Sequence, residues 1–157
     1  MQEKVVSEHA ELPVESKMIN LRGQMVILDK DVALLYQVKT KHVNQAVRNN
    51  PEKFPDGYVF ELNDAEMELV KNFDQIPSNS HYAAKAFTEK GLYMLATILK
   101  GAEATSTTIR IIETYAKMKE AGRNLRQMIN EDKEKEYTIE INLMAFKLSR
   151  TVKKSKK

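Results

Sequence analysis

The chain has 157 residues, 42% of them hydrophobic and 30% charged, which is the composition of a soluble globular protein of one domain with an appendage. It contains no cysteine, which excludes disulfides, cysteine-ligated zinc and a thiol nucleophile, and which fits a reducing compartment. The amino terminus lacks the apolar core of a signal peptide, and the longest apolar run, residues 92–99, is too short to span a bilayer. We therefore expect a cytoplasmic protein with no membrane partner.

The net charge of +3 is too small to indicate a nucleic-acid partner by itself, but the bases are unevenly distributed. Residues 147–157 hold six lysines or arginines and no acid, so residues 1–146 together carry −3. A second basic cluster covers residues 39–53, with Glu52 as its only acid. The basic tail has three interpretations: non-specific phosphate contacts, a solvated helix end, or a disordered solubility tail.

The first 28 residues predict a flexible lead-in followed by a β-hairpin. Residues 1–17 are polar with scattered valines and one proline, which is typical of a flexible terminus. Residues 18–28 contain two short β-favouring runs on either side of Arg22-Gly23. Because glycine adopts the positive φ that a tight hairpin turn requires, we expect the chain to turn there.

Residues 28–50 predict two short helices joined by a tight turn. Asp29 is placed to cap the first helix and Thr40 the second. Apolar inward positions recur at helical spacing: Val32, Leu35, Tyr36, Val43, Ala46 and Val47. The small Ala33 lets the second helix cross closely, and Val38 fills the gap at the turn. The second helix is expected to end before Pro51, because the residue before a proline avoids the helical backbone conformation.

The segment that follows predicts a turn, a strand and a capped helix. Residues 55–57, Pro-Asp-Gly, form a turn signal, and residues 58–60 favour a strand. Asn63 and Glu66 have the spacing of a capping box, which predicts a helix over residues 64–73.

Beyond that helix the sequence predicts a loop, a strand fragment and another capped helix. Residues 77–80 predict the loop, and residues 86–87 the strand fragment. Thr88 is placed to cap a helix over residues 89–99, and Gly101 to end it.

The last third of the chain predicts helix with an apolar seam. Ser106 or Thr107 is placed to cap a helix from about Thr108. Apolar residues then recur in alternating four- and three-residue steps, which is typical of a helix that packs on a partner helix. They are Ile111, Tyr115, Met118, Leu125 and Ile129, with Gly122 in the one gap, and Tyr137, Ile141, Met144 and Leu148 after the charged residues 131–136. Residues 137–143 also alternate strictly, so a strand stays open there, although we favour helix.

The second helix of the predicted pair carries the side chains of a DNA reader. Asn and Gln pair with adenine, Arg and Lys pair with guanine, and lysines together with a helix N-terminus hold phosphates. In a helix-turn-helix the second helix lies in the major groove. The candidate contacts are Arg22, Lys39, Thr40, Lys41, His42, Asn44, Gln45, Arg48, Asn49 and Lys53. We expect residues 41–49 to enter the major groove of DNA. We expect Arg22, Lys39, Lys53 and the basic tail to contact the DNA backbone.

Catalytic and metal-binding patterns are weak in this sequence. Asp29 and Asp31 are neighbouring acids, but their place at a helix start explains them through the helix dipole. His9, His42 and His81 do not have metal-ligand spacing, and the five glycines form no phosphate-binding loop. We therefore expect no enzyme activity, no cofactor and no metal.

The motifs of residues 18–118 resemble those of the ORF-six-N domain, a relative of the KilA-N group. That family opens with IRGQ-x-V-x-LD-x-DLA-x-LYGV-x-T-x-x-LN and continues with RN-x-x-RFP-x-x-F-x-F-x-L and AFTE-x-G-x-x-ML. The matching residues are Arg22-Gly23-Gln24, Leu28-Asp29, Asp31-Val32-Ala33, Leu35-Tyr36, Val38, Thr40, Asn44, Arg48-Asn49, Lys53-Phe54-Pro55, Tyr58, Phe60, Leu62 and Ala86 through Leu95. A final block resembles residues 109–115. The family glycine after the tyrosine is Gln37 here, where positive φ tends to be needed.

The resemblance implies a DNA-binding domain of phage, prophage or mobile-element proteins, often antirepressors or regulators, and the arrangement also resembles Bro-type antirepressor domains. We expect an α+β fold, mostly helical, with a short hairpin and strand fragments around a helix-turn-helix. The expected parts are a lead-in (1–17), the DNA-binding domain (18–118) and a helical extension with the basic tail (119–157). Double-stranded DNA is the expected partner, with self-association or a repressor bound through the C-terminal helices. The alternatives are a protein-interaction antirepressor and, more remotely, a nuclease.

Overall fold

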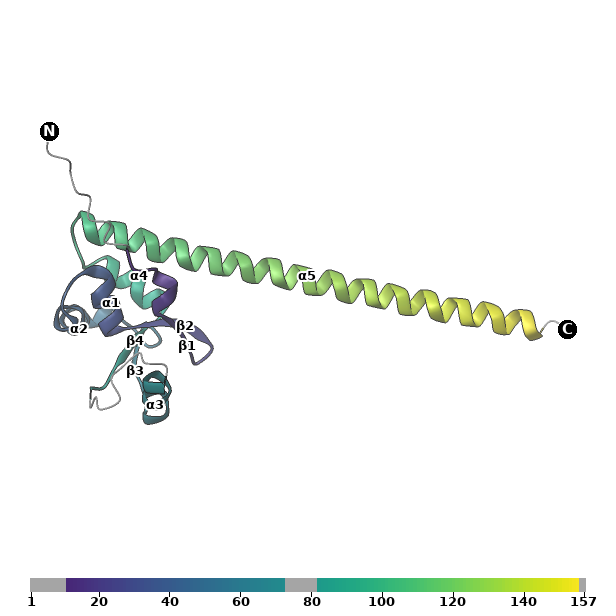
Figure 1. Cartoon of the computed structure of the whole chain (residues 1–157), viewed down its shortest axis with the longest axis horizontal. Coiled ribbons are helices and arrows are strands. Elements are labelled where there is room, and N and C mark those ends of the chain that lie inside the picture. Colours follow the sequence, from purple (N-terminus) through teal and green to yellow (C-terminus); the bar gives the residue numbers. More distant parts are fainter. Residues whose placement is uncertain (1–10, 73–81, 156–157) are drawn as a thin grey trace, which may run out of the picture. The chain divides into compact units, whose positions relative to one another are not determined.

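The structure is a computed structural model that describes residues 11–72 and 82–155, with side chains up to residue 147. It confirms a mostly helical α+β fold with a small antiparallel sheet (Figure 1). The chain forms two units, Met1–Tyr115 and Ala116–Lys157. The elements are η1 (Val14–Lys17), β1 (Met18–Leu21), β2 (Gln24–Leu28), α1 (Asp29–Tyr36), α2 (Thr40–Asn49), η2 (Pro51–Lys53), β3 (Val59–Glu61), α3 (Asp64–Asn72), β4 (Lys85–Phe87), α4 (Glu89–Ala96) and α5 (Ala102–Ser155).

The predicted hairpin is confirmed, and its turn consists of two residues. β1 and β2 pair antiparallel, and Leu21 faces Gln24 across the turn. Both turn residues have positive φ, 54° at Arg22 and 73° at Gly23, as a hairpin turn that follows the strand twist requires. Sequence pattern anticipated this conformation at the glycine but not at the arginine.

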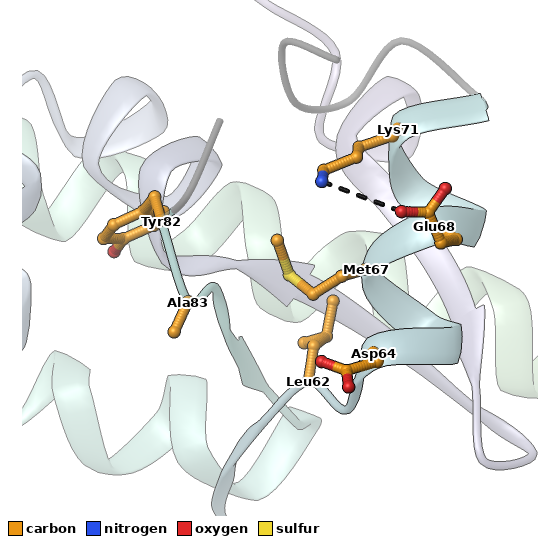
Figure 2. Close-up of a pocket in the computed structure, with 7 residues that line it drawn as sticks. All are labelled: Leu62, Asp64, Met67, Glu68, Lys71, Tyr82 and Ala83. Atoms are coloured by element: carbon orange, nitrogen blue, oxygen red, sulfur yellow. Dashed lines mark ion pairs between the residues drawn. The ribbon is translucent and has the colours of Figure 1, made fainter. Parts of the chain in front are cut away.

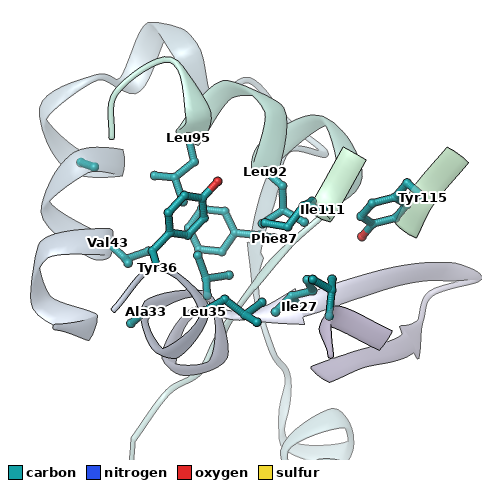
Figure 3. Packing of buried hydrophobic residues seen from close by; sticks show 13 residues of the cluster. Ile27, Ala33, Leu35, Tyr36, Val43, Phe87, Leu92, Leu95, Ile111 and Tyr115 are labelled. Carbon is teal, nitrogen blue, oxygen red and sulfur yellow. The ribbon is translucent and has the colours of Figure 1, made fainter. Parts of the chain in front are cut away.

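The four strands are ordered β1-β2-β4-β3, and apolar clusters cover both faces of this sheet. Ile27 and Phe87 are paired across β2 and β4 and belong to a cluster with α1, α2, α4 and the start of α5 (Figure 3). The alternate residues Val26 and Leu28 belong to a second cluster, which includes Val70 of α3. Because successive side chains of a strand point to opposite faces, β2 is buried on both sides.

The two predicted short helices are present as α1 and α2, joined by residues 37–39. Gln37 adopts the left-handed conformation, with φ of 55°, which is the conformation expected where the family carries glycine. The amide of Val38 donates to the carbonyl of Ala33, which closes the end of α1. Both predicted N-caps are wrong by one residue: Leu28 and Lys39 hold the cap positions, because β2 runs directly into α1 and the three-residue turn runs directly into α2.

The capping box before α3 is confirmed. The amide of Glu66 donates to the Asn63 side chain at 2.9 Å, and the Asn63 amide donates to the Glu66 carboxylate at 3.0 Å. The helix ends at Asn72 within the described residues, and the loop predicted at 77–80 lies outside them.

Two other helix boundaries differ from prediction. α4 begins after Thr88 as expected but ends at Ala96 rather than 99, where the Thr97 hydroxyl bonds the Met94 carbonyl. α5 begins at Ala102, six residues earlier than predicted from Thr108. Thr107 therefore caps nothing, and its hydroxyl donates to the Leu35 carbonyl at 3.2 Å.

Residues 14–17, predicted as part of the flexible lead-in, form the short helix η1. Val14 is 2% exposed and packs in the core cluster of α1 and α2. Lys17 lies 3.7 Å from the carboxylate of Asp31. The apolar side chain and the ion pair hold this stretch in place, and residues 1–17 contain no apolar periodicity from which the helix could have been predicted.

Residues 116–155 continue α5, so the helical interpretation of residues 137–143 is confirmed over the strand. The large apolar side chains of residues 125–146 are exposed, from 45% at Ile129 to 67% at Tyr137. Among the described residues, no helix combines the length and hydropathy needed to cross a membrane.

Thr88 and Gly91 form a close junction between α4 and the turn before β3. The Thr88 hydroxyl bonds the carbonyls of Gly57 and Tyr58, at 2.9 and 3.0 Å, and accepts the amide of Gly91. A Cβ atom on Gly91 would lie 2.0 Å from the Tyr58 carbonyl oxygen. Glycine is thus required here for the close backbone approach.

Replacing Gly91 with alanine should lower the free energy of unfolding by at least about 1–3 kcal/mol, because backbone atoms rather than a flexible side chain must move. Chemical denaturation followed by circular dichroism measures the change. Glu120→Ala is the control, since Glu120 is an exposed residue of α5 that lies outside the core and outside this junction. A Gly91→Ala protein as stable as the control would show that the junction adjusts freely.

Candidate nucleic-acid interface

The outer face of α2 is polar and basic. Val43 and Ala46 are buried on the inner face, whereas Lys41 and Arg48 are exposed. Lys41, Gln45 and Arg48 follow four- and three-residue steps, so they form one line along the helix. Of the predicted contacts, the exposed ones are Arg22, Lys39, Lys41, His42, Arg48 and Asn49, and the half-buried ones are Thr40, Asn44, Gln45 and Lys53.

Asn44, a predicted base reader, is instead bound within the protein. Its side-chain amide donates to the carboxylate of Asp29 at 3.1 Å and to the hydroxyl of Tyr82 at 3.2 Å. The Tyr82 hydroxyl also donates to the same carboxylate oxygen of Asp29. Asn44 lies at the border between the inner and outer faces of α2, where it reaches the start of α1.

The carboxylate of Asp29 is fully buried, with 0% exposure. Besides Asn44 and Tyr82, the backbone amide of Lys30 donates to it at 3.0 Å. A buried carboxylate is costly unless hydrogen-bond donors replace its water, and these three donors do so. Asp29 therefore connects α1, α2 and the chain entering β4, a role that its predicted N-cap position did not reveal.

Tyr82 belongs to the hydrogen-bond network around Asp29, and the sequence analysis did not identify it. Burial, and then the hydrogen bond to Asp29, raise the pKa of Tyr82 to about 12. The hydroxyl therefore stays protonated near neutral pH and acts as a donor. Tyr82 lies 53 residues from Asp29, and no spacing rule connects residues so far apart.

Two of the residues predicted to contact the DNA backbone, Arg22 and Lys53, bind other side chains of the protein. The guanidinium of Arg22 bonds the Glu66 carboxylate at 2.9 Å and lies 3.9 Å from the centre of the Phe60 ring. It connects the hairpin turn to the start of α3. The Lys53 ammonium donates to the Thr97 hydroxyl at 3.0 Å, a neutral acceptor that leaves its charge uncompensated by that contact. Lys53 thus remains compatible with a phosphate, whereas Arg22 is committed to Glu66.

The second acid of α1, Asp31, is 2% exposed. Burial raises the pKa of this carboxyl, and the nearby Lys17 opposes the shift. Its Oδ2 atom is buried with no hydrogen-bond partner in the described part of the chain. His9 and His81 lie outside the described residues, and within those residues no three potential ligands gather as a metal site would require.

A hollow of about 320 Å³ lies between α3 and the residues that precede β4. Figure 2 shows its lining, which includes Met67 and the ion pair of Lys71 with Glu68, 3.8 Å apart. Lys71 and Glu68 already pair with each other across one turn of α3, and the described part of the lining contains no histidine or serine. The described lining residues therefore do not bring together an acid, a base and a nucleophile.

The fold and the site together define a small helix-rich α+β domain that carries an exposed basic helix. The family model described as the ORF6N domain matches residues 16–98, more than half of the chain. The chain therefore belongs to the ORF6N domain family, as its ORF-six-N motifs indicated. No curated protein and no solved structure matches it.

Replacing Asn44 with alanine should lower the free energy of unfolding by about 1–3 kcal/mol, because the buried Asp29 carboxylate loses a donor. Thermal and denaturant unfolding measure the change. Asn49→Ala is the control, since Asn49 is an exposed residue of the same type on the same helix and should change stability by less than about 0.5 kcal/mol. Equal stabilities of the two variants would contradict a structural role for Asn44.

Proposed function

We propose that this protein binds double-stranded DNA as a regulator, with α1 and α2 acting as a helix-turn-helix and α2 entering the major groove. The observation that carries the proposal is the outer face of α2, where Lys41, Gln45 and Arg48 form a line. Residues 39–50 contain no acid, so nothing on this helix repels phosphate.

The dimensions of α2 support this placement. An α-helix with its side chains is about 10–12 Å in diameter and the major groove is about 12 Å wide, so α2 can lie in the groove, where its ten residues extend for about 15 Å. Val43 and Ala46 anchor its opposite face in the core, which fixes its orientation. A rigid, half-buried helix loses little conformational entropy when it binds.

We assign separate roles to the exposed side chains. Arg48 and Gln45 are placed to pair with guanine and adenine, while Lys39, Lys41 and Lys53 hold phosphates. His42 and Asn49, at the edge of the face, contact the backbone or water. We leave Asn44 and Arg22 out of this set, because their donors are bound to Asp29 and Glu66.

The ORF6N domain is a phage-type family, which supports a regulator of phage or mobile-element origin. A protein-interaction antirepressor is the second candidate. The exposed apolar residues of α5, Leu125 and Ile129 among them, favour it, since exposed apolar faces are typical of protein contacts. The two functions separate experimentally, because DNA binding depends on α2 and repressor binding on residues 125–146.

Replacing Arg48 with alanine should lower affinity for the cognate duplex by about 5- to 150-fold, the equivalent of 1–3 kcal/mol. Replacing Lys41 should weaken binding on all sequences and reduce the salt slope by about one. Fluorescence anisotropy against duplex fragments that flank the gene, repeated over a salt series, measures both effects.

Lys117→Ala is the control for these variants, since it removes the same charge from an exposed position on α5. If the wild-type protein binds no duplex even at low salt, the DNA-binding proposal fails and the antirepressor candidate takes its place. If it binds but the Arg48 and Lys41 variants equal the control, another surface reads the DNA.

A further inference from the structure

The second unit carries a palindromic seam along α5. Positions that alternate by three and four residues lie on one side of a helix, and we call this line of positions the seam. Starting at Gly122, the seam positions are Gly122, Leu125, Ile129, Asp132, Glu136, Ile139, Leu143 and Phe146. Read from either end towards residue 134, a leucine, an isoleucine and an acid follow in the same order. The apolar seam side chains are 45% to 59% exposed. The acids stand at its centre.

This register corrects the seam predicted from sequence beyond residue 131. Tyr137, Ile141 and Met144 repeat the four- and three-residue steps, but they begin eight residues after Ile129 and so leave the register. At 100° per residue, Ile139 and Ile141 point to nearly opposite sides of the helix. The seam proper therefore continues through Ile139 and Leu143, and Tyr137 lies on the other face.

We propose that residues 122–146 pair with the same residues of a second copy of this chain as an antiparallel helix pair centred on Glu134. Leu125 then meets the partner's Leu143, and Ile129 meets the partner's Ile139. A two-fold symmetric contact places each residue of one chain against its mirror position in the other, which is what a palindromic seam provides. The seam covers more than three heptads, the length typical of a coiled coil.

The mirror pairing also sets which charges meet. Asp132 is level with the partner's Glu136, and Lys133 is level with the partner's Lys135. Each acid of the seam therefore has a lysine of the other chain one residue from its own level, and Arg126 lies two residues from the level of the partner's Glu140. Polar residues at seam positions fix register at a cost in stability. A shift by one heptad would place Asp132 against isoleucine or leucine.

The sizes of the end residues favour the antiparallel direction over the parallel one. In a parallel pair Gly122 would face glycine and leave a gap, while Phe146 would face phenylalanine. In the antiparallel pair Gly122 faces the partner's Phe146, and a Cβ on Gly122 would meet no atom of its own chain within 4 Å. A small residue opposite a large one fills the layer without a void.

An intramolecular hairpin would use the same palindrome, but the middle of the helix opposes it. Residues 131–136, EDKEKE, contain neither glycine nor proline, and glutamate and lysine are good helix formers. α5 accordingly runs unbroken through them. The second copy of the chain is therefore the occupant of the seam.

Sedimentation equilibrium of the full-length protein tests the pairing. We expect a dimer for the wild type and loss of the dimer for Ile129→Asp, because a charge replaces a seam side chain. Ile141→Asp, on the opposite face, is the matched control and should stay dimeric. Circular dichroism of each full-length variant checks its folding, since the core of the globular unit contains neither residue. A monomeric wild type, or dissociation by the control variant alone, would overturn the proposal.

Spin labels on single cysteines test the direction, and the native chain has no cysteine to interfere. Labels at Asn124 should be at least about 30 Å apart in the antiparallel dimer, since this residue is level with the partner's Met144, twenty residues along the helix. In a parallel dimer the two labels would be level with each other. Glu134 is the centre of the pair, so two labels there are level with each other in the antiparallel dimer and in the parallel dimer. Their distance serves as the reference for a level pair. A distance at Asn124 equal to that at Glu134 would contradict the antiparallel arrangement.

Discussion

The buried carboxylate of Asp29 is the interaction on which the arrangement of the helix pair depends. It has 0% exposure and takes hydrogen bonds from Lys30, Asn44 and Tyr82, which belong to α1, α2 and the chain before β4. A charge in this position is tolerated only while its donors stay in place. The network therefore opposes any rotation of α2 that would move Asn44 away from α1.

This constraint divides α2 into two faces with separate tasks. The inner face, with Val43 and Ala46, belongs to the core. Asn44 lies at the border of this face and donates a hydrogen bond to the Asp29 carboxylate. The outer face carries Lys41, Gln45 and Arg48, the side chains that our proposal directs at DNA. Pre-organisation of this kind favours binding, because the helix does not have to be ordered when the ligand arrives.

The structure explains physically why several motif residues are needed. Thr88 bonds the turn at residues 57–58, and Gly91 leaves room for the Tyr58 carbonyl, so this motif fastens α4 to the strand edge. Gln37, the motif position after Tyr36, adopts the left-handed conformation that glycine adopts most readily. These motif residues stabilise the scaffold through contacts within the chain.

Local sequence pattern predicted the hairpin, the helix pair, the capping box at Asn63 and the helical last third, because each depends on residues within a few positions of one another. The palindrome of α5 is likewise a feature of the sequence. The roles of Asn44, Arg22 and Tyr82 emerged from the folded structure alone, because their partners lie 15 to 53 residues away and depend on how the elements pack. The burial of Val14 and the early start of α5 were likewise decided by packing, since local pattern carries no information about which distant surface a residue meets.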